Sequence, residues 1–354
     1  MLYIYALVFV LLVILEYVYF GIAKKFNIVD KPNARSSHSK VVILGGGIIF
    51  AIAPIIWTIW MLLADKEGVL SNGYLAFIAG MVMVAAISFI DDIKSLPQSA
   101  RLVVQLTATA LLLYGAGFWQ SHPWWMMLAF VALIIVFAGA TNIFNFMDGL
   151  NGMMVGYSLA VMIPMRILNG DSSYFICPEL EANGFIDSSF LIVTIIALVI
   201  FMFFNYRPKN KALCFAGDVG SISVAFVLLF ALGRLIKQTD DITWLCLFAV
   251  YGVDGCLTII HRLMLHEHIG QAHRKHCYQI MANELKLGHL TVSTTYTCIQ
   301  LVISLMMIYL IPDNQTSHWI YFISVLLVLS TAYILFMKKY YHLHEEYLES
   351  VKKG

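Results

Sequence analysis

Charged residues are scarce in this chain of 354 residues: 12% are Asp, Glu, Lys or Arg, whereas 60% are hydrophobic. A soluble domain keeps more charge on its surface, so this composition excludes an ordinary soluble globular protein. The mean hydropathy of +0.82 instead indicates that most of the chain lies in a bilayer. The formal net charge is only +1, and we expect no nucleic-acid partner.

Paired cysteines are also lacking, because the six cysteines are scattered and no Cys-x-x-Cys pair occurs. This spacing argues against a disulfide framework and against a zinc-thiolate site. No soluble domain, internal repeat or low-complexity stretch is found. The sequence therefore predicts a single polytopic membrane domain over residues 1–354, with 338–354 as a cytoplasmic tail. The first apolar run lacks a basic start and a cleavage site, so we expect a retained anchor.

Long apolar runs account for most of the chain, and each is long enough to cross a membrane as a helix. We expect an all-α polytopic protein of about ten or eleven transmembrane helices. The predicted spans are 2–20, 46–63, 74–90, 100–117, 124–141, 153–168, 189–204, 219–236, 242–260, 292–311 and 318–337.

The basic residues indicate which way these spans run. If alternate connections beginning with 21–45 and ending with 338–354 face the cytoplasm, those connections hold 18 of the 22 Lys and Arg residues. Because cytoplasmic loops are enriched in Lys and Arg, this bias predicts an outside N-terminus and a cytoplasmic C-terminus.

Acidic motifs end or begin several spans, and all of them fall on the predicted cytoplasmic side: Asp91-Asp92, Asp148 and Asp218. Ionisable groups at membrane depth usually mark a functional site. Carboxylates that face one aqueous surface suggest a hard divalent cation and a phosphate group. The alternatives are solvated charges paired with Lys94 at a helix end, and a helix N-cap at Asp218.

A second group of motifs adds amides, histidines and glycines on the same face. Asn142, Asn145 and Asp148 recur every three residues, which suits either a ligand site or a polar helix C-cap. The tract Ala272–His276 reads AHRKH and provides donors for anionic oxygens. The triplet Gly45–Gly47 opens a helix and is compatible with phosphate binding or with tight helix packing.

Taken in order, these segments resemble the polyprenyl-phosphate N-acetylhexosamine-1-phosphate transferases. The resemblance covers most of the chain and rests on the motifs KPNARSSH, GGG, DDIKSL, NFMDGLNG, FNYRP, FAGDVGS, DGCLTIIHR and AHRKH. It implies a Mg²⁺-dependent enzyme, with Mn²⁺ as an alternative ion. The reaction would transfer a sugar-1-phosphate from a UDP-N-acetylhexosamine to undecaprenyl phosphate and release UMP.

The resemblance also implies roles for particular residues. Asp218 would bind the metal, and Asp91 and Asp92 would position the metal and the lipid phosphate, with Asp91 as a candidate base. The diphosphate-sugar region would lie against Asn145 and Asp148. Further implied substrate contacts are Lys31, Asn151, Asn205 and Phe215, together with the basic diphosphate-binding residues His273, Arg274 and His276.

The same resemblance implies a multi-pass protein of the bacterial inner membrane, with its site on the cytoplasmic face and a homodimer as the expected assembly. UDP-GlcNAc is the default donor, for O-antigen, capsule or another cell-envelope glycan. The alternative is the phospho-N-acetylmuramoyl-pentapeptide translocase, whose histidine triplet is replaced here by His273–His276. Asn151 also stands where many relatives carry Asp. A cation-coupled transporter is the alternative from another class, but the span centres are apolar.

Overall fold

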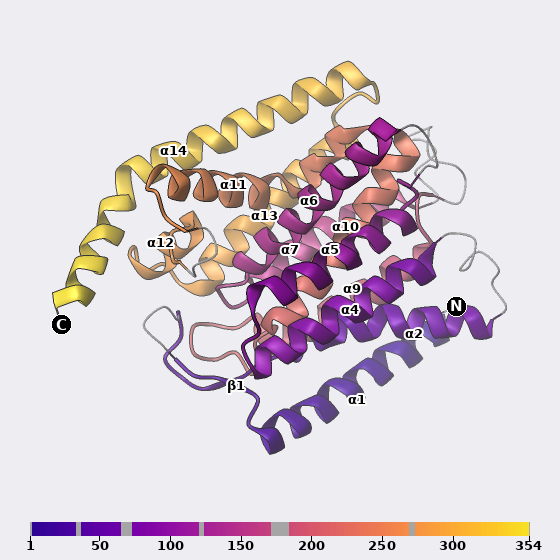
Figure 1. The fold of residues 1–354 in the computed structure, drawn as a ribbon, viewed down its shortest axis with the longest axis horizontal. Coiled ribbons are helices and arrows are strands. Elements are labelled where there is room, and N and C mark those ends of the chain that lie inside the picture. Colours follow the sequence, from indigo (N-terminus) through magenta and orange to yellow (C-terminus); the bar gives the residue numbers. More distant parts are fainter. Residues whose placement is uncertain are drawn as a thin grey trace.

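The structure of the protein is a computed structural model that describes residues 2–32, 37–64, 73–119, 124–170, 184–268 and 273–353. Almost all of this part is helical (Figure 1). The helices are α1 (Leu2–Phe26), α2 (Ile49–Leu63), α4 (Tyr74–Ile93), α5 (Gln98–Gly115), α6 (Trp124–Phe146), α7 (Met153–Leu168), α9 (Ser188–Asn205), α10 (Gly217–Thr239), α11 (Ala249–Met264), α12 (Cys277–Asn283), α13 (His289–Tyr309) and α14 (Gln315–Lys353).

Short elements complete the fold. The 3-10 helices η1 (Gly46–Ile48) and η2 (Ile242–Phe248) lead into α2 and α11. The strands β1 (Val29–Asp30) and β2 (Val42–Ile43) pair antiparallel, with Val29 opposite Ile43.

The prediction of an all-α polytopic membrane protein is confirmed. Each of the eleven predicted spans overlaps one of these helices, and nine helices of the described part are long and apolar enough to cross a membrane. Helices α5 and α7 are not among the nine, and α7 is an apolar helix of 16 residues. The short helix α12, inside the histidine-rich segment, was not predicted.

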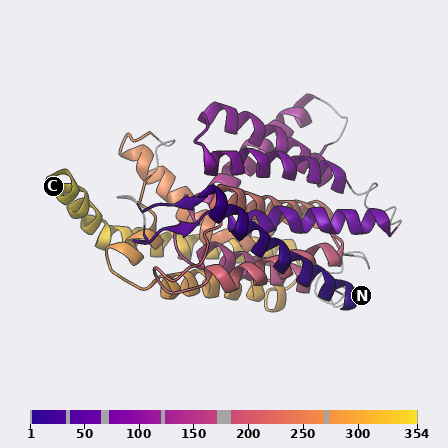
Figure 2. The same cartoon turned by 90° about the horizontal axis from the view of Figure 1, so that it is seen from below.

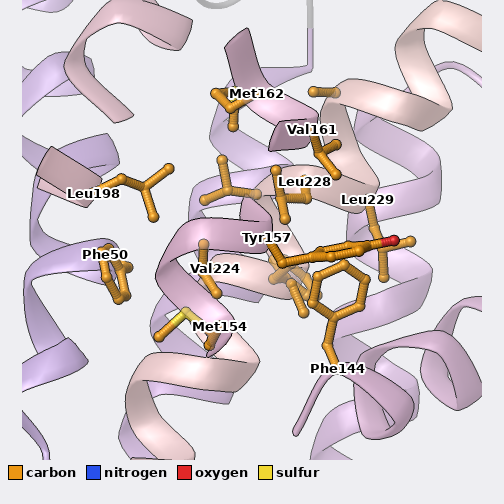
Figure 3. Close-up of a cluster of buried hydrophobic side chains, with 14 of the residues drawn as sticks. Phe50, Phe144, Met154, Tyr157, Val161, Met162, Leu198, Val224, Leu228 and Leu229 are labelled. Carbon is orange, nitrogen blue, oxygen red and sulfur yellow. The ribbon is translucent and has the colours of Figure 1, made fainter. Parts of the chain in front are cut away.

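Helix α10 lies at the centre of the bundle because its sequence is apolar on every side. Its side chains pack against α2, α4, α6 and α7. Figure 3 shows Val224, Leu228 and Leu229 of this helix among side chains of α7, including Tyr157. The ring of Tyr157 also stacks on that of Tyr251 in α11, with centroids 3.5 Å apart.

A close contact between two glycines packs η1 against α10. A Cβ on Gly47 would lie 2.4 Å from the Cα of Gly220, so only glycine allows this approach. The Gly46 and Gly47 N–H groups donate to the carbonyls of Phe215 and Ala216, at 2.9 and 3.1 Å. The sequence allowed two roles for the glycine triplet, phosphate binding or tight helix packing. The structure shows tight packing of Gly46 and Gly47 against the start of α10.

The two termini lie at opposite ends of the bundle (Figures 1 and 2). This arrangement agrees with an odd number of crossings. Which end faces the cytoplasm stays a prediction. The β1–β2 hairpin and α12 lie toward the end of the bundle where the chain's C-terminus is found (Figure 1).

Candidate active site

A cavity of about 1010 Å³ opens between the helices at the end that carries the acidic motifs. Its walls come from α4, α5, α6 and α10, and from the loops that follow β1 and α6. The polar residues along its wall are Asp30, Ser37, His38, Ser88, Asp92, Gln98, Arg101, Gln105, Asn142, Asn145, Asp148, Asn151, Asn205, Asp218, Gln279 and His289. Apolar side chains such as Val84, Ile87 and Leu102 also line the cavity.

Asp92, in the last turn of α4, caps the start of α10. Its two carboxylate oxygens accept hydrogen bonds from the backbone N–H groups of Asp218 and Val219, at 2.9 and 3.0 Å. Free N–H groups and a positive potential at a helix N-terminus both favour such a carboxylate. Gly217 makes room for it, because a Cβ there would lie 2.5 Å from Oδ2 of Asp92.

Asp218 lies in the first turn of α10, and Ala216, not Asp218, is the N-cap residue of this helix. Oδ2 of Asp218 lies 2.8 Å from Nη2 of Arg101, in the first turn of α5. Nη1 of the same guanidinium lies 2.6 Å from Oδ2 of Asp91. Arg101 therefore joins two of the predicted acidic residues. Lys94, the expected partner of the pair at the end of α4, is exposed.

The segment after α6 meets the same group of carboxylates. Ser221 of α10 donates a hydrogen bond to Oδ1 of Asn145, at 2.6 Å. Asp148 follows α6 and lines the cavity. Burial, and secondly the negative charge of Asp218, raise the pKa of Asp148 to about 7. The site thus gathers more negative charge than Arg101 balances.

This donor set suits a Mg²⁺ ion that shares its coordination with a substrate. Mg²⁺ commonly takes one or two carboxylates, and phosphate oxygens and water complete its octahedron. Within the described residues, no group of three or more His, Cys, Asp or Glu side chains is placed to hold a metal by itself. The arrangement therefore fits an ion that arrives with a phosphate, and does not fit an all-protein metal cage.

Phe215 and the N-terminal hairpin form another part of the cavity wall, which we call the Phe215 end. The backbone of Phe215 is fixed by a bond from its N–H to the Ile43 carbonyl, at 2.8 Å. The ring of His38 packs edge-on against the Phe215 ring, with centroids 4.8 Å apart. His38 is held in turn by Asp30, whose Oδ2 lies 3.0 Å from Nε2. An aromatic face thus borders the cavity where a flat ring can stack.

Asn151 and Asn205 line this end as predicted, but their amides bind backbone. Nδ2 of Asn151 donates to the carbonyls of Arg207 and Pro208. Oδ1 of Asn205 accepts from the Gly152 N–H at 2.7 Å, and its Nδ2 donates to the Cys214 carbonyl. The two side chains therefore connect the loop after α6 to the loop after α9.

The predicted basic motif lies beside the cavity and not on its described wall. His276 begins α12, and its Nδ1 lies 3.1 Å from Oδ1 of Asp254 in α11. The ring of His273 is near that of Phe146, and burial lowers the pKa of His273 to about 3. The Arg274 guanidinium pairs with Glu284 at 2.8 Å. Lys31 is exposed, and Ala272 lies outside the described residues.

Several wall residues were not predicted from the sequence, among them Arg101, His38 and His289. Arg101 lies one turn into the helix that follows the Asp91-Asp92 loop, so its proximity to that pair was the available signal. His289, at the start of α13, is buried, and its Nδ1 lies 3.4 Å from the Asn151 backbone nitrogen. Nothing in the sequence around His289 indicated this contact.

Comparison with known proteins gives a family match over the region that carries the acidic residues. The model of the family described as "Glycosyl transferase family 4" matches residues 74–235, which include Asp91, Asp92, Asp148 and Asp218. A Bacillus subtilis (strain 168) protein named "Probable undecaprenyl-phosphate N-acetylglucosaminyl 1-phosphate transferase" is 24% identical over 278 residues, which cover 73% of this chain and 70% of that protein.

Two further relatives carry related names. The "Undecaprenyl-phosphate alpha-N-acetylglucosaminyl 1-phosphate transferase" of Yersinia pestis is 28% identical, over 68% of this chain and 66% of that protein. The "Phospho-N-acetylmuramoyl-pentapeptide-transferase" of Lactiplantibacillus plantarum is 23% identical, over 52% of this chain and 58% of that protein. The chain therefore spans between 58% and 70% of the length of these relatives.

Proposed function

Because residues 74–235 match the model of glycosyl transferase family 4, we propose that the chain transfers an N-acetylhexosamine-1-phosphate from a UDP-sugar to undecaprenyl phosphate and releases UMP. The observation that carries the proposal is the convergence of Asp91, Asp92, Asp148 and Asp218 on one cavity or its edge, with Arg101 between two of them. The apolar side chains that line the same cavity suit a substrate that comes from the membrane.

The proposed step is a displacement at phosphorus. A phosphate oxygen of undecaprenyl phosphate forms a bond to the sugar-linked phosphorus of the UDP-sugar, and the bond from that phosphorus to UMP breaks. Such a reaction depends on positioning and on stabilisation of charge, and it needs no covalent enzyme intermediate. We assign Arg101 to hold phosphate oxygens and Asp91, as a candidate base, to hold a proton beside the lipid phosphate.

Mg²⁺ is the ion that we propose for the site. Asp218, with Asp91 and Asp92 beside it, would hold the ion, which would neutralise the phosphate charges when bound. Asn145 and Asp148 would lie against the diphosphate-sugar region. His273 and His276 supply further polar groups from the neighbouring segment.

The donor and the pathway follow from the relatives' names. Two of the three relatives are named as N-acetylglucosaminyl 1-phosphate transferases, which makes UDP-GlcNAc the proposed donor. The product would be the first lipid-linked sugar of a cell-envelope glycan such as O-antigen. The corresponding location is the bacterial inner membrane, with the cavity facing the cytoplasm.

Release of UMP tests the proposal directly. The purified protein is incubated with undecaprenyl phosphate, Mg²⁺ and either UDP-GlcNAc, a related UDP-amino sugar or UDP-N-acetylmuramoyl-pentapeptide. We expect UMP from UDP-GlcNAc that depends on both the lipid and the ion. UMP from the pentapeptide donor alone would instead establish the activity in the name of the Lactiplantibacillus plantarum relative. No UMP from any donor would contradict the proposed reaction.

The nucleotide end of the cavity has its own test. Phe215 borders the cavity with its ring, so we expect Phe215→Ala to raise the KM for the UDP-sugar tenfold or more by removing a stacking surface for uracil. The KM for undecaprenyl phosphate should change little. Phe203→Ala is the matched control, because Phe203 is 67% exposed on α9. Equal KM values in the two variants would place Phe215 outside the nucleotide site.

A further inference from the structure

Helix α14 continues past the rest of the bundle, and its last part lies next to α12 (Figure 1). We call residues 338–349 of α14 the tail segment. It lies outside the 74–235 region that matches the family. Tyr347 and Tyr341 of the tail segment contact Arg274 and Lys275 of the AHRKH motif. Two polar groups and an apolar cluster connect this part of α14 to α11, α12 and the motif.

The first polar group is centred on Glu284, which follows α12. Its Oε1 accepts from Nη2 of Arg274 at 2.8 Å and lies 3.1 Å from Nδ1 of His344 in the tail segment. The guanidinium of Arg274 also lies over the ring of Tyr347, 4.3 Å from its centroid. The Glu284 and His344 side chains are only 4% and 2% exposed. A carboxylate so buried is stable only while both partners stay in place.

The second polar group joins α11 to the same segment. Lys275 pairs with Glu267, which also accepts from Nε of Arg262 at 3.2 Å. The Lys275 ammonium faces the ring of Tyr341 in the tail segment, 5.7 Å from its centroid. Both cations of the AHRKH motif are therefore engaged by carboxylates and tyrosines outside the cavity.

An apolar cluster lies beneath these ion pairs. It joins α11, α12 and α14 and is separate from the main core of the bundle. Its buried members are Val253, Cys277, Ile280, Tyr333 and Met337. Helix α12 has only seven residues, too few to be stable by itself, so its position depends on these neighbours.

Helix α12 in turn supports the catalytic segment after α6. Tyr278 donates a hydrogen bond to the Phe146 carbonyl at 2.7 Å. A Cβ on Gly149 would lie 2.3 Å from the Tyr278 hydroxyl oxygen, so the two segments are in close contact. Asp148 lies between these two contact points in the sequence, and Gln279 of α12 lines the cavity.

We infer that the tail segment of α14 holds α12 against the Asp148 segment, and that Arg274 is a positioning residue of this connection and not a phosphate ligand. The inference rests on the proposed transferase function, because it specifies how Asp148 is kept in place for that reaction. Arg274 acts through Glu284 and α12. His344 and Tyr347 complete the connection from the tail side.

Charge reversal separates the two roles of Arg274. Arg274→Glu should lower kcat for UMP release tenfold or more, since it sets two carboxylates against each other. The double variant Arg274→Glu with Glu284→Arg restores the pair in the opposite orientation, and we expect its kcat to return to within about threefold of the parent. A phosphate ligand cannot be replaced in this way. A double variant as inactive as the single one would overturn the inference.

A tail variant provides a second test in case the reversed pair does not fold. Tyr347→Ala should lower kcat about threefold and leave the KM for the UDP-sugar unchanged, whereas Tyr347→Trp keeps an aromatic face for Arg274 and should retain kcat. Lys338→Glu is the control, because Lys338 is exposed on the same helix. An unchanged kcat in Tyr347→Ala would count against the inference.

Hydrogen exchange measures the connection without any turnover. Amides of residues 277–283 should exchange faster in Arg274→Glu and in Tyr347→Ala, and at the parent rate in the double variant. If exchange is faster in these two variants but the parent protein releases no UMP, the connection between the tail segment and α12 is supported and the proposed function is contradicted. Unchanged exchange in an active parent would reject the connection alone.

Discussion

At the scale of single residues, Asp92 and Asp218 both lie at the start of α10 but have different contacts. Asp92 accepts both backbone bonds there, whereas Asp218 faces Arg101. We expect Asp218→Asn to abolish Mg²⁺-dependent UMP release, because an amide is a weak ligand for a hard cation.

The folded state of this variant should survive, since the cap of α10 comes from Asp92. Purified yield and thermal unfolding in detergent measure this point. Near-normal turnover in Asp218→Asn, with the usual dependence on Mg²⁺, would show that Asp218 is not a metal ligand.

Asp148 gives the site a pH dependence with a defined sign. Its pKa is raised from 3.8 to about 7, so from about pH 4 to pH 7 the folded protein holds more proton at this carboxyl than the unfolded chain does. Its contribution to stability is therefore present at low pH and is lost as the pH rises through about 7.

Asp148→Asn removes the titration, so the variant should gain thermal stability relative to the parent as the pH rises from about 5 to about 8. Differential scanning fluorimetry of both proteins across this range measures the difference. A difference that is independent of pH would mean that Asp148 is ionised in the folded protein throughout.

At the scale of elements, the contact between η1 and α10 sets the wall of the site. Gly47 and Gly220 touch through their backbones, and the same stretch of α10 carries Asp218. We expect Gly47→Ala to force these elements apart, at a cost of about 1–3 kcal/mol in unfolding free energy. Turnover should fall because Asp218 moves relative to α4.

Gly21→Ala in α1 is the matched control, since a Cβ there meets no atom within 4 Å. Thermal unfolding and UMP release of the two variants should therefore differ. If both behave like the parent, the glycine contact has no part in placing the site.

At the scale of the whole molecule, the basic residues predict which end of the bundle faces the cytoplasm. Lys209 lies in the loop after α9, near the cavity, and Thr316 lies at the start of α14 toward the opposite end; both are exposed. In a cysteine-free background, an impermeant thiol reagent added outside the cell should label Thr316→Cys and spare Lys209→Cys.

Permeabilised cells provide the control, because both positions should then be labelled. Labelling of Lys209→Cys in intact cells would reverse the topology. It would also place the cavity on the outer face, where the UDP-sugars of the cytoplasm do not occur.

The sequence by itself determined the membrane class, the approximate positions of the helices that the eleven predicted spans overlap, and the acidic residues that line or border the cavity. An apolar run of bilayer length is predicted to be a helix, because hydrocarbon offers no hydrogen-bond partners and a helix satisfies its own backbone N–H and C=O groups. Carboxylates at the ends of such runs stand out in the sequence, because an ionisable group near the hydrocarbon is costly and usually has a function. The family resemblance added the reaction to this prediction, and the matched region 74–235 agrees with it.

Only the tertiary structure decided which partners the side chains of those residues contact. Local spacing does not reveal that Asp92 caps a helix distant in sequence, or that Arg101 bridges Asp91 and Asp218. Spacing likewise gave no indication that Arg274 faces Glu284 and Tyr347. Each of these contacts joins separate helices whose relative placement depends on packing. A hydrogen bond or ion pair between such helices exists only after the bundle has formed.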